Sequence, residues 1–377
     1  MIRLILIVLL FLLSLLAVFK AFEYHLWLLA IAVTEFPWLF SSITIVVLLT
    51  GFFGGRFIMP GTIIGIVALL LFLSPIARAY VIAGNVRAEF DSAFAVTNTD
   101  SSSAPFSFFK MFKKPVNIAY KKITYIKYAH TAMSLDFYPS QIAGKKPCVI
   151  VVHGGSWAGG DSQQLPELNS YLATKGYNVA SINYRLAPKW QTPAPVEDVA
   201  NATKYIREHA DELNVDTTQF VLIGRSAGAQ IALLAAYTMH NKNLKGVIDF
   251  YGPADMVWGY SAPASPLIMD SRKVMEQYIG GSYSQVPQKY FDCSPLVYVD
   301  KQSVPTLIIH GNSDVLVSPE HSHRLNGALQ NSGVKHYWLQ LPWATHGFDF
   351  NLNGPGGQLS TYTVLQFLNT VTRSTIH

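Results

Sequence analysis

The stretch Gly224-Arg225-Ser226-Ala227-Gly228 decides the fold of this chain. It follows the apolar run 220–223, which predicts a short buried strand, and it precedes residues 229–236, which predict a helix. A serine at a sharp strand-to-helix turn stands at the helix N-terminus, where free backbone N–H groups favour an oxyanion. Small neighbours are needed because the strained serine backbone lies close to adjoining chain. The stretch therefore predicts a nucleophile elbow with Ser226 as the nucleophile.

Asp314 and His346 are the predicted partners of Ser226. Asp314 ends the segment His310-Gly311-Asn312-Ser313-Asp314, directly after a predicted strand, and His346 follows the last predicted strand. Both positions fall at carboxyl ends of strands, where open α/β sheets build their sites. Asp314 is expected to orient His346, which exchanges the serine proton with the leaving group. Each alone has an ordinary explanation, a turn aspartate or one of 11 histidines, but their order and positions together favour a triad.

The segment His153-Gly154-Gly155-Ser156-Trp157 follows another apolar run, residues 148–152. In a fold of this kind the loop after that strand supplies oxyanion donors. Glycines let backbone N–H groups approach a substrate oxygen, so we expect an oxyanion hole built from Gly154, Gly155 and Ala227. The alternative, a plain glycine turn, is disfavoured by the matching position.

Two further motifs, Asn183-Tyr184-Arg185-Leu186-Ala187-Pro188 and Glu197-Asp198, complete a resemblance to the α/β-hydrolase family. More narrowly, the chain resembles the esterase/lipase branch related to hormone-sensitive lipase and the feruloyl-esterase-like hydrolases. The resemblance covers roughly residues 120–375. It implies a mostly parallel sheet flanked by helices, and ester hydrolysis through a Ser-His-Asp triad and an acyl-enzyme.

The chain departs from the family pattern at two positions. Ser156 stands where the hormone-sensitive branch usually has a third glycine, so the acyl pocket beside the oxyanion hole is expected to differ. Asn183 replaces a common aspartate, a change we interpret as structural. We expect Tyr184 and Arg185 to brace the strand end without binding substrate.

The N-terminal region is unusually apolar. Half of the chain is hydrophobic and 14% is charged, and the apolar excess lies mostly in the first eighty-odd residues. We predict three membrane segments, roughly 2–20, 36–54 and 60–83, each near the ~20 residues that a bilayer needs. The stretch from Tyr24 to Glu35 is expected at the membrane interface. The sequence thus predicts a multi-pass membrane protein, and the scattered basic residues assign no orientation.

Three regions follow from these patterns. Residues 1–95 form the predicted membrane region of about three hydrophobic helices, and the small polar stretch 96–105 forms a linker. Residues 106–377 form the predicted α/β-hydrolase domain, with a lid-like insertion near 254–303 that either lines an acyl pocket or covers the core. Residues 106–114 interleave aromatic and basic side chains, which fits a membrane surface or an edge packed on the catalytic domain.

Several function classes are not indicated. The net charge is +5 without a long Lys/Arg run, so no nucleic-acid partner is expected. His321 and His323 lack a cluster of further ligands, and no phosphate-binding or dinucleotide motif is present, so no metal or cofactor is expected. Cys148 is interpreted as a buried free thiol, and a disulfide with Cys293 is unsupported. The expected partners are a small-molecule ester or lipid substrate and membrane lipids.

Two alternatives to ester hydrolysis stay open. An amide hydrolase of the arylformamidase or peptidase kind uses the same triad and a similar His-Gly-Gly-x-Trp loop. A non-catalytic membrane-anchored protein, whose hydrolase domain only binds a ligand or partner, would require the loss of a triad member, and none is lost from this sequence.

Overall fold

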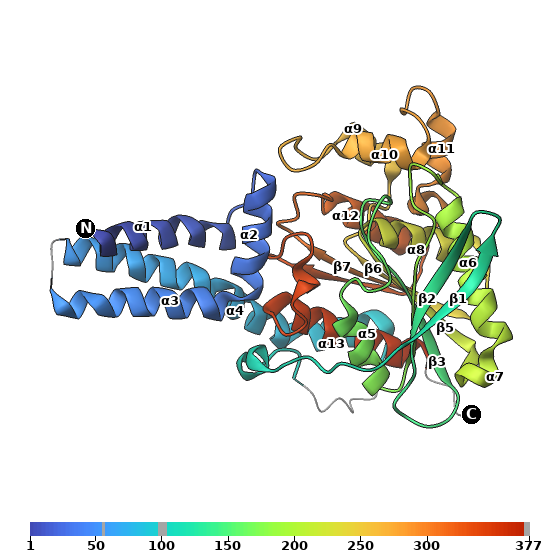
Figure 1. Cartoon of the computed structure of the whole chain (residues 1–377), viewed down its shortest axis with the longest axis horizontal. Helices are drawn as coiled ribbons and strands as arrows, with labels where there is room; N and C mark the ends of the chain where they lie inside the picture. The colour runs from blue at the N-terminus through green and yellow to red at the C-terminus, as the bar shows by residue number, and fades with distance from the viewer. Residues whose placement is uncertain (55–56, 97–103, 373–377) are drawn as a thin grey trace.

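A large central sheet organises the catalytic region of the computed structural model, which describes residues 1–54, 57–96 and 104–372. Within these residues the strand order is β1-β2-β4-β3-β5-β6-β7-β8 (Figure 1). The pairs β1–β2 and β2–β4 are antiparallel, and all other neighbours are parallel, as predicted for an α/β-hydrolase sheet. The strands are β1 (Lys121–Tyr128), β2 (Thr131–Tyr138), β3 (Lys146–Val152), β4 (Asn178–Ile182), β5 (Val215–Arg225), β6 (Leu244–Phe250), β7 (Thr306–Gly311) and β8 (His336–Leu341).

The central strands are continuous apolar runs because helices cover both faces of the sheet. Ile150 and Val152 of β3 face one apolar core, and Val149 and Val151 face the other. The first core is closed by α6 (Ala194–Glu208), α8 (Ala227–Thr238) and α12 (Glu320–Asn331). The second core is closed by α5 (Pro166–Thr174), α13 (Pro355–Val371) and part of α4 (Ile58–Phe94). The short helix α7 (Ala210–Leu213) leads into β5.

The N-terminal residues form a helical arm that projects from the catalytic region (Figure 1). Its long axis is made by α1 (Ile2–Ser14) with the 3₁₀ turn η1 (Leu15–Ala17), by α3 (Pro37–Leu49) with η2 (Thr50–Phe53), and by the first half of α4. Helix α2 (Tyr24–Glu35) lies across the base of this bundle, between it and the catalytic region. The arm therefore meets the catalytic region through α2 and α4.

The prediction of three membrane spans is not confirmed. Among the described helices, α4 alone is long and apolar enough to cross a bilayer, and α2 with α3, bent by 85°, meets the same criterion as a pair. Helix α1 has 13 residues followed by a three-residue 3₁₀ turn, which is shorter than a full span. The apolar run predicted at 2–20 is thus longer than the helix it forms.

Helix α4 does not end with the arm. Its second half carries Val86, Phe90 and Phe94, which are buried at i, i+4 spacing against the sheet. The ring of Phe94 packs on Phe367 of α13, and that of Phe90 on Tyr337 of β8. The expected boundary at residue 95 therefore does not separate two domains, because one helix belongs to both. Most of the predicted linker, residues 97–103, lies outside the described residues.

The predicted lid at 254–303 consists of short helices joined by turns. It contains α9 (Met256–Ser261), α10 (Ser271–Ile279), α11 (Pro287–Asp292) and the 3₁₀ turn η4 (Pro295–Tyr298). The carboxylates of Asp255 and Asp270 cap the first two helices by accepting backbone N–H bonds from Trp258 and Lys273. These capping hydrogen bonds stabilise helices that are too short to show a clear apolar period in the sequence. We call this layer, which lies above α8 and α12 in Figure 1, the cap.

Residues 106–114 pack against the catalytic region, one of the two arrangements expected for them. Phe106 and Met111 are buried, and the backbone of Ser107 exchanges two hydrogen bonds with the side chain of Gln358, at 2.9 and 3.1 Å. The ring of Phe109, however, is 79% exposed. Contact of such exposed rings with a membrane surface stays a prediction.

Replacing Phe90 by alanine tests whether the end of α4 belongs to the catalytic core. Deleting a buried phenylalanine costs about 3–5 kcal/mol. We expect Phe90→Ala to lower the thermal unfolding midpoint of the detergent-solubilised chain by about 5–15 °C. The matched control is Phe109→Ala, which removes an exposed ring. Equal midpoints for the two variants would contradict the assignment of α4 to the core.

Candidate active site

Ser226 sits at the corner between β5 and α8, in a strained backbone conformation with φ 52° and ψ −121°. The corner is tight because α8 begins against the end of β3. A Cβ atom at Gly228 would lie 2.2 Å from the carbonyl oxygen of His153, and one at Gly224 would lie 2.3 Å from the Cα of Ala229. The two flanking glycines are therefore required by close packing, as expected from the sequence.

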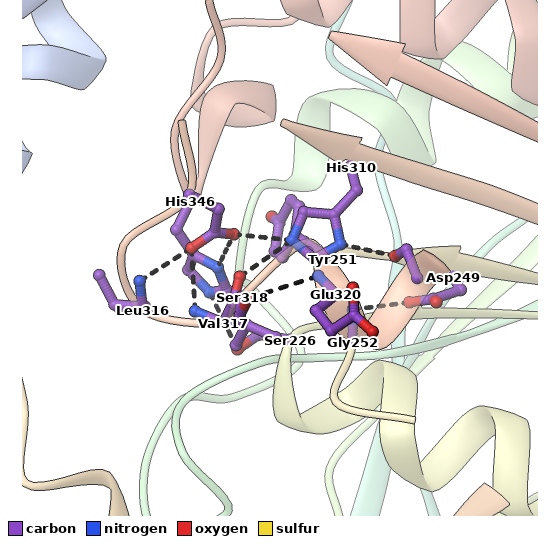
Figure 2. A network of polar contacts seen from close by, with 12 residues as sticks. Ser226, Asp249, Tyr251, Gly252, His310, Leu316, Val317, Ser318, Glu320 and His346 are labelled. Atoms are coloured by element: carbon purple, nitrogen blue, oxygen red, sulfur yellow. Dashed lines mark hydrogen bonds and ion pairs between the residues drawn. The ribbon is translucent and has the colours of Figure 1, made fainter. Parts of the chain in front are cut away.

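The structure brings Ser226, His346 and Asp314 into one hydrogen-bonded chain. Figure 2 shows Ser226 and His346 within this network. The Nε2 atom of His346 lies 3.0 Å from the Ser226 hydroxyl, and its Nδ1 atom lies 2.7 Å from Asp314 Oδ2. The other oxygen of Asp314 accepts backbone N–H bonds from Leu316 at 2.8 Å and Val317 at 2.9 Å. The loop after β7 thus holds the carboxylate, and the carboxylate holds the imidazole.

The electrostatics of the chain favour an ionised carboxylate. Burial alone would raise the pKa of Asp314, but His346 and His310 beside it lower the pKa well below the ordinary value. A carboxylate that stays ionised accepts the Nδ1 proton of His346, which leaves Nε2 free to accept the serine proton.

His310 is a member of this cluster to which the sequence assigned no role. Its Nε2 atom lies 3.2 Å from Asp314 Oδ2 and 3.1 Å from the carbonyl oxygen of Val317. Because a carbonyl only accepts, Nε2 carries a proton, and Nδ1 forms a hydrogen bond with the hydroxyl of Ser322 at 2.6 Å. His310 is thus a second donor to Asp314. Its place directly before the Gly-Asn-Ser-Asp loop was the available signal.

The three expected oxyanion donors are not equivalent. The N–H of Gly154 donates to the side-chain oxygen of Gln164 at 2.6 Å. Among the described residues, no acceptor is found for the N–H groups of Gly155 and Ala227. The three residues border the space beside Ser226. Gly155 and Ala227 therefore remain available to a substrate oxygen, and Gly154 would need Gln164 to move.

A buried ion pair links the serine corner to the histidine loop. Arg225, the residue before Ser226, donates from Nε to Asp349 at 2.6 Å. Asp349 lies in the 3₁₀ turn η5 (Phe348–Phe350), which directly follows the His346 loop, and it also accepts from the hydroxyl of Tyr251. The ring of Tyr251 packs 4.4 Å from that of His346. This arrangement fixes the distance between the two loops that carry Ser226 and His346.

Two cavities flank Ser226. The first, of about 450 Å³, lies under the cap and is bordered by Trp157, Met269 and Ala227. We call it the cap cavity. Large apolar side chains of the cap line it, among them Trp258, Ile268 and Met269. Ser156, which replaces the usual third glycine, borders the cap cavity and points its hydroxyl at Met269 Sδ, 3.6 Å away.

The second cavity, of about 440 Å³, lies on the histidine side of Ser226 and is bordered by His346 and Phe350. Part of its wall comes from the loop of Gly154 and Gly155, and part comes from the arm, through Trp27 and Leu28 of α2. We call it the α2 cavity. No sequence signal indicated that the arm contributes to the site.

Residues interpreted as structural do brace the strand ends. The hydroxyl of Tyr184 donates to the carbonyl of His153, whose ring stacks on Tyr184 and whose pKa burial lowers to about 4. Arg185 pairs with Asp198 at 2.9 Å. Cys148 and Cys293 are both buried free thiols.

Comparison with known proteins places this arrangement in a class. The chain has the α/β-hydrolase fold. It superimposes on the hyperthermophilic esterase from Pyrobaculum calidifontis with a TM-score of 0.61 and 21% sequence identity, over 80% of this chain and 99% of that one. The BD-FAE family model matches residues 135–329, just over half of the 377 residues, and the chain belongs to this family.

Curated relatives share the catalytic region. The chain is 31% identical to esterase LipC of Mycobacterium tuberculosis over 248 residues, which cover 60% of this chain and 59% of that protein. It is 27% identical to the isoprenylcysteine alpha-carbonyl methylesterase ICME of Arabidopsis thaliana over 227 residues, which cover 56% of this chain and 53% of that protein. The chain therefore spans little more than half the length of these relatives.

Asp249, a buried carboxyl at the end of β6 close to His310, provides a test of the electrostatics behind the site. Burial raises its pKa to about 7, although His310 and the N–H of Gly252 act in the opposite direction. An unfolded aspartate titrates near 3.9, so the folded state binds the proton more tightly between about pH 4 and pH 7. The free energy of unfolding should therefore fall as pH rises through that window.

The variant Asp249→Asn keeps an acceptor for Gly252 and removes the titration. We expect the unfolding midpoint of the variant to rise relative to that of the wild type as pH is raised from 5 to 8. Thermal melts in detergent measure both midpoints. A constant difference across this range would show that Asp249 does not titrate with a raised pKa.

Proposed function

We propose that this protein is a membrane-anchored serine hydrolase that cleaves carboxylic esters through an acyl-enzyme. The observation that carries the proposal is the hydrogen-bonded chain from Asp314 through His346 to Ser226, placed at carboxyl ends of the sheet. The curated relatives named as esterases support the choice of an ester substrate. The BD-FAE family match, over residues 135–329, includes Ser226 and Asp314.

The proposed reaction has two halves. The Ser226 oxygen attacks the ester carbon while His346 Nε2 takes the hydroxyl proton, and the N–H groups of Gly155 and Ala227 stabilise the oxyanion. The bond between carbon and alcohol oxygen then breaks, and His346 returns the proton to the alcohol. Water repeats the sequence on the acyl-enzyme, releasing the acid and restoring Ser226. Asp314 stabilises the imidazolium that forms in both halves.

The arm is proposed as the anchor. Helices α1, α3 and α4 expose large apolar side chains, including Leu9, Val46, Ile63 and Leu70. Apolar surface of this extent on a protein marks contact with a membrane or a partner, and the composition of α4 fits a bilayer span. Charged groups lie toward both ends of the bundle. Arg3 donates a hydrogen bond to the backbone carbonyl at the start of α4, and Lys20 lies beside the catalytic region.

Covalent labelling tests the nucleophile. A fluorophosphonate probe should label the wild type and leave Ser226→Ala unlabelled, while Ser156→Ala, which removes another hydroxyl at the same site, should retain the label. Hydrolysis of p-nitrophenyl esters should be lost with the label. Wild-type turnover in Ser226→Ala would refute the assignment, and an amide cleaved faster than every ester tested would favour the amide-hydrolase alternative.

The role of Asp314 gives a second prediction. Asp314→Asn preserves the shape of the side chain but no longer stabilises the imidazolium, so kcat should fall by about 10³–10⁴-fold with a much smaller change in KM. Because triad members act as a unit, adding Asp314→Asn to Ser226→Ala should cost little more than Ser226→Ala alone. Additive losses in the double variant would contradict a shared mechanism.

A further inference from the structure

Helix α2 is built into the candidate active site. Three residues of α2 line the α2 cavity, namely Trp27, Leu28 and Ile31. Ser226 and His346 of the catalytic region line the same cavity. The indole nitrogen of Trp27 donates a hydrogen bond to the backbone carbonyl of His346 at 3.0 Å. A helix of the arm thus contacts both the loop that carries the histidine and the space where a substrate must lie.

The position of α2 is fixed at both ends by the catalytic region. At its start, the N–H of Tyr24 donates to the carbonyl of Leu267 in the cap at 3.1 Å. At its end, the buried carboxylate of Glu35 accepts the N–H of Gly356, in the first turn of α13, at 3.0 Å. The backbone carbonyl of Glu35 also accepts from the Asn351 side chain at 2.8 Å. These hydrogen bonds hold both ends of α2 against the catalytic region, so that α2 forms a wall of the site.

The mouth of the α2 cavity is apolar and continuous with the arm. Leu28 is 43% exposed and Phe350 is 60% exposed, and both line the cavity. Phe19 and Phe22, which lead into α2, are also exposed. Helix α2, which carries Leu28, lies where the apolar bundle meets the catalytic region (Figure 1), so this mouth opens at that level if the arm lies in a bilayer.

The chemistry of the triad distinguishes the two cavities. The departing alcohol must lie beside His346, which returns a proton to it, and His346 borders the α2 cavity. The oxyanion donors do not distinguish the cavities, since Ala227 borders the cap cavity and Gly155 borders the α2 cavity, but His346 borders the α2 cavity and not the cap cavity, whose wall carries the apolar cap side chains. The alcohol portion of the ester therefore belongs to the α2 cavity, and the acyl portion to the cap cavity.

We infer that the α2 cavity receives the apolar alcohol portion of an ester that resides in the bilayer, with α2 as the wall that selects it. The inference rests on the proposed ester hydrolysis at Ser226. The substrate class is an ester of a long-chain or lipid-like alcohol. It enters laterally from the membrane between α2 and the η5 turn, and its carbonyl reaches Ser226 while its apolar alcohol stays against Leu28 and Ile31.

A pair of isomeric esters tests the assignment of the two cavities. Octyl acetate carries its chain on the alcohol and ethyl octanoate carries it on the acyl group, so their overall hydrophobicity is similar. The full chain is reconstituted in phosphatidylcholine vesicles, and kcat/KM is measured for both esters. Active sites are counted by fluorophosphonate labelling.

The variants are Leu28→Gln and Leu29→Gln. Both leucines are 43% exposed and adjacent on α2, and Leu28 borders the α2 cavity, whereas Leu29 borders neither the α2 cavity nor the cap cavity. Losing the apolar contact of one leucine should lower the ratio of octyl acetate to ethyl octanoate turnover about tenfold in Leu28→Gln. The ratio should stay within about twofold in Leu29→Gln. Trp258→Ala, in the cap cavity, should change the ratio in the opposite direction.

Lateral entry is tested with hexadecyl acetate, which exchanges slowly through water. Hydrolysis should be fast when enzyme and ester share a vesicle and at least tenfold slower when they are placed in separate vesicles. Equal rates in the two arrangements would overturn entry from the bilayer. An unchanged isomer ratio in Leu28→Gln would overturn α2 as the wall for the alcohol.

These outcomes are distinct from failure of the proposed function. One outcome is that Ser226 is labelled and both isomers are cleaved, but Leu28→Gln leaves the ratio of octyl acetate to ethyl octanoate turnover unchanged. Ester hydrolysis then stands and the inference about α2 is wrong. If the wild type is neither labelled nor active on any ester, both fall together.

Discussion

The close approach of α8 to the end of β3 is the constraint on which the rest of the site depends. Backbone atoms of His153 lie where any side chain at Gly228 would be, so the two segments meet only through glycine. This contact holds the Ser226 corner beside the loop of Gly154 and Gly155, and it places α8 so that its first N–H groups face the same space. The buried pair of Arg225 and Asp349 then sets the distance to the histidine loop.

Much of the catalytic region was predictable because its signals are local. Parallel strands that are buried on both faces read as apolar runs, and site residues follow their carboxyl ends, so the order of Ser226, Asp314 and His346 along the chain was informative. The engagement of Gly154 by Gln164 was not predictable, because it depends on how two loops meet in space. The short cap helices escaped detection since their stability comes from caps and packing.

The arm was predicted as apolar but not in its arrangement. Hydropathy shows that a helix avoids water and does not show whether lipid or protein covers it, so the buried half of α4 and the place of α2 were missed. Glu35 was the available clue. A carboxylate in an apolar stretch needs hydrogen-bond donors, and the glycine-rich start of α13, Gly354-Pro355-Gly356-Gly357, presents backbone N–H groups at a helix N-terminus.

Helix α4 runs from the arm to the face of the sheet that α5 and α13 also cover. This helix of 37 residues, with Pro75 inside it, links the arm directly to the catalytic core, so the catalytic region stays close to whatever surface holds the arm. With the arm in a bilayer, as proposed, the protein would meet a membrane-resident ester by diffusion in two dimensions. Its velocity would follow the number of ester molecules per unit area of membrane, and diluting the vesicles at constant composition would leave the turnover of each molecule unchanged.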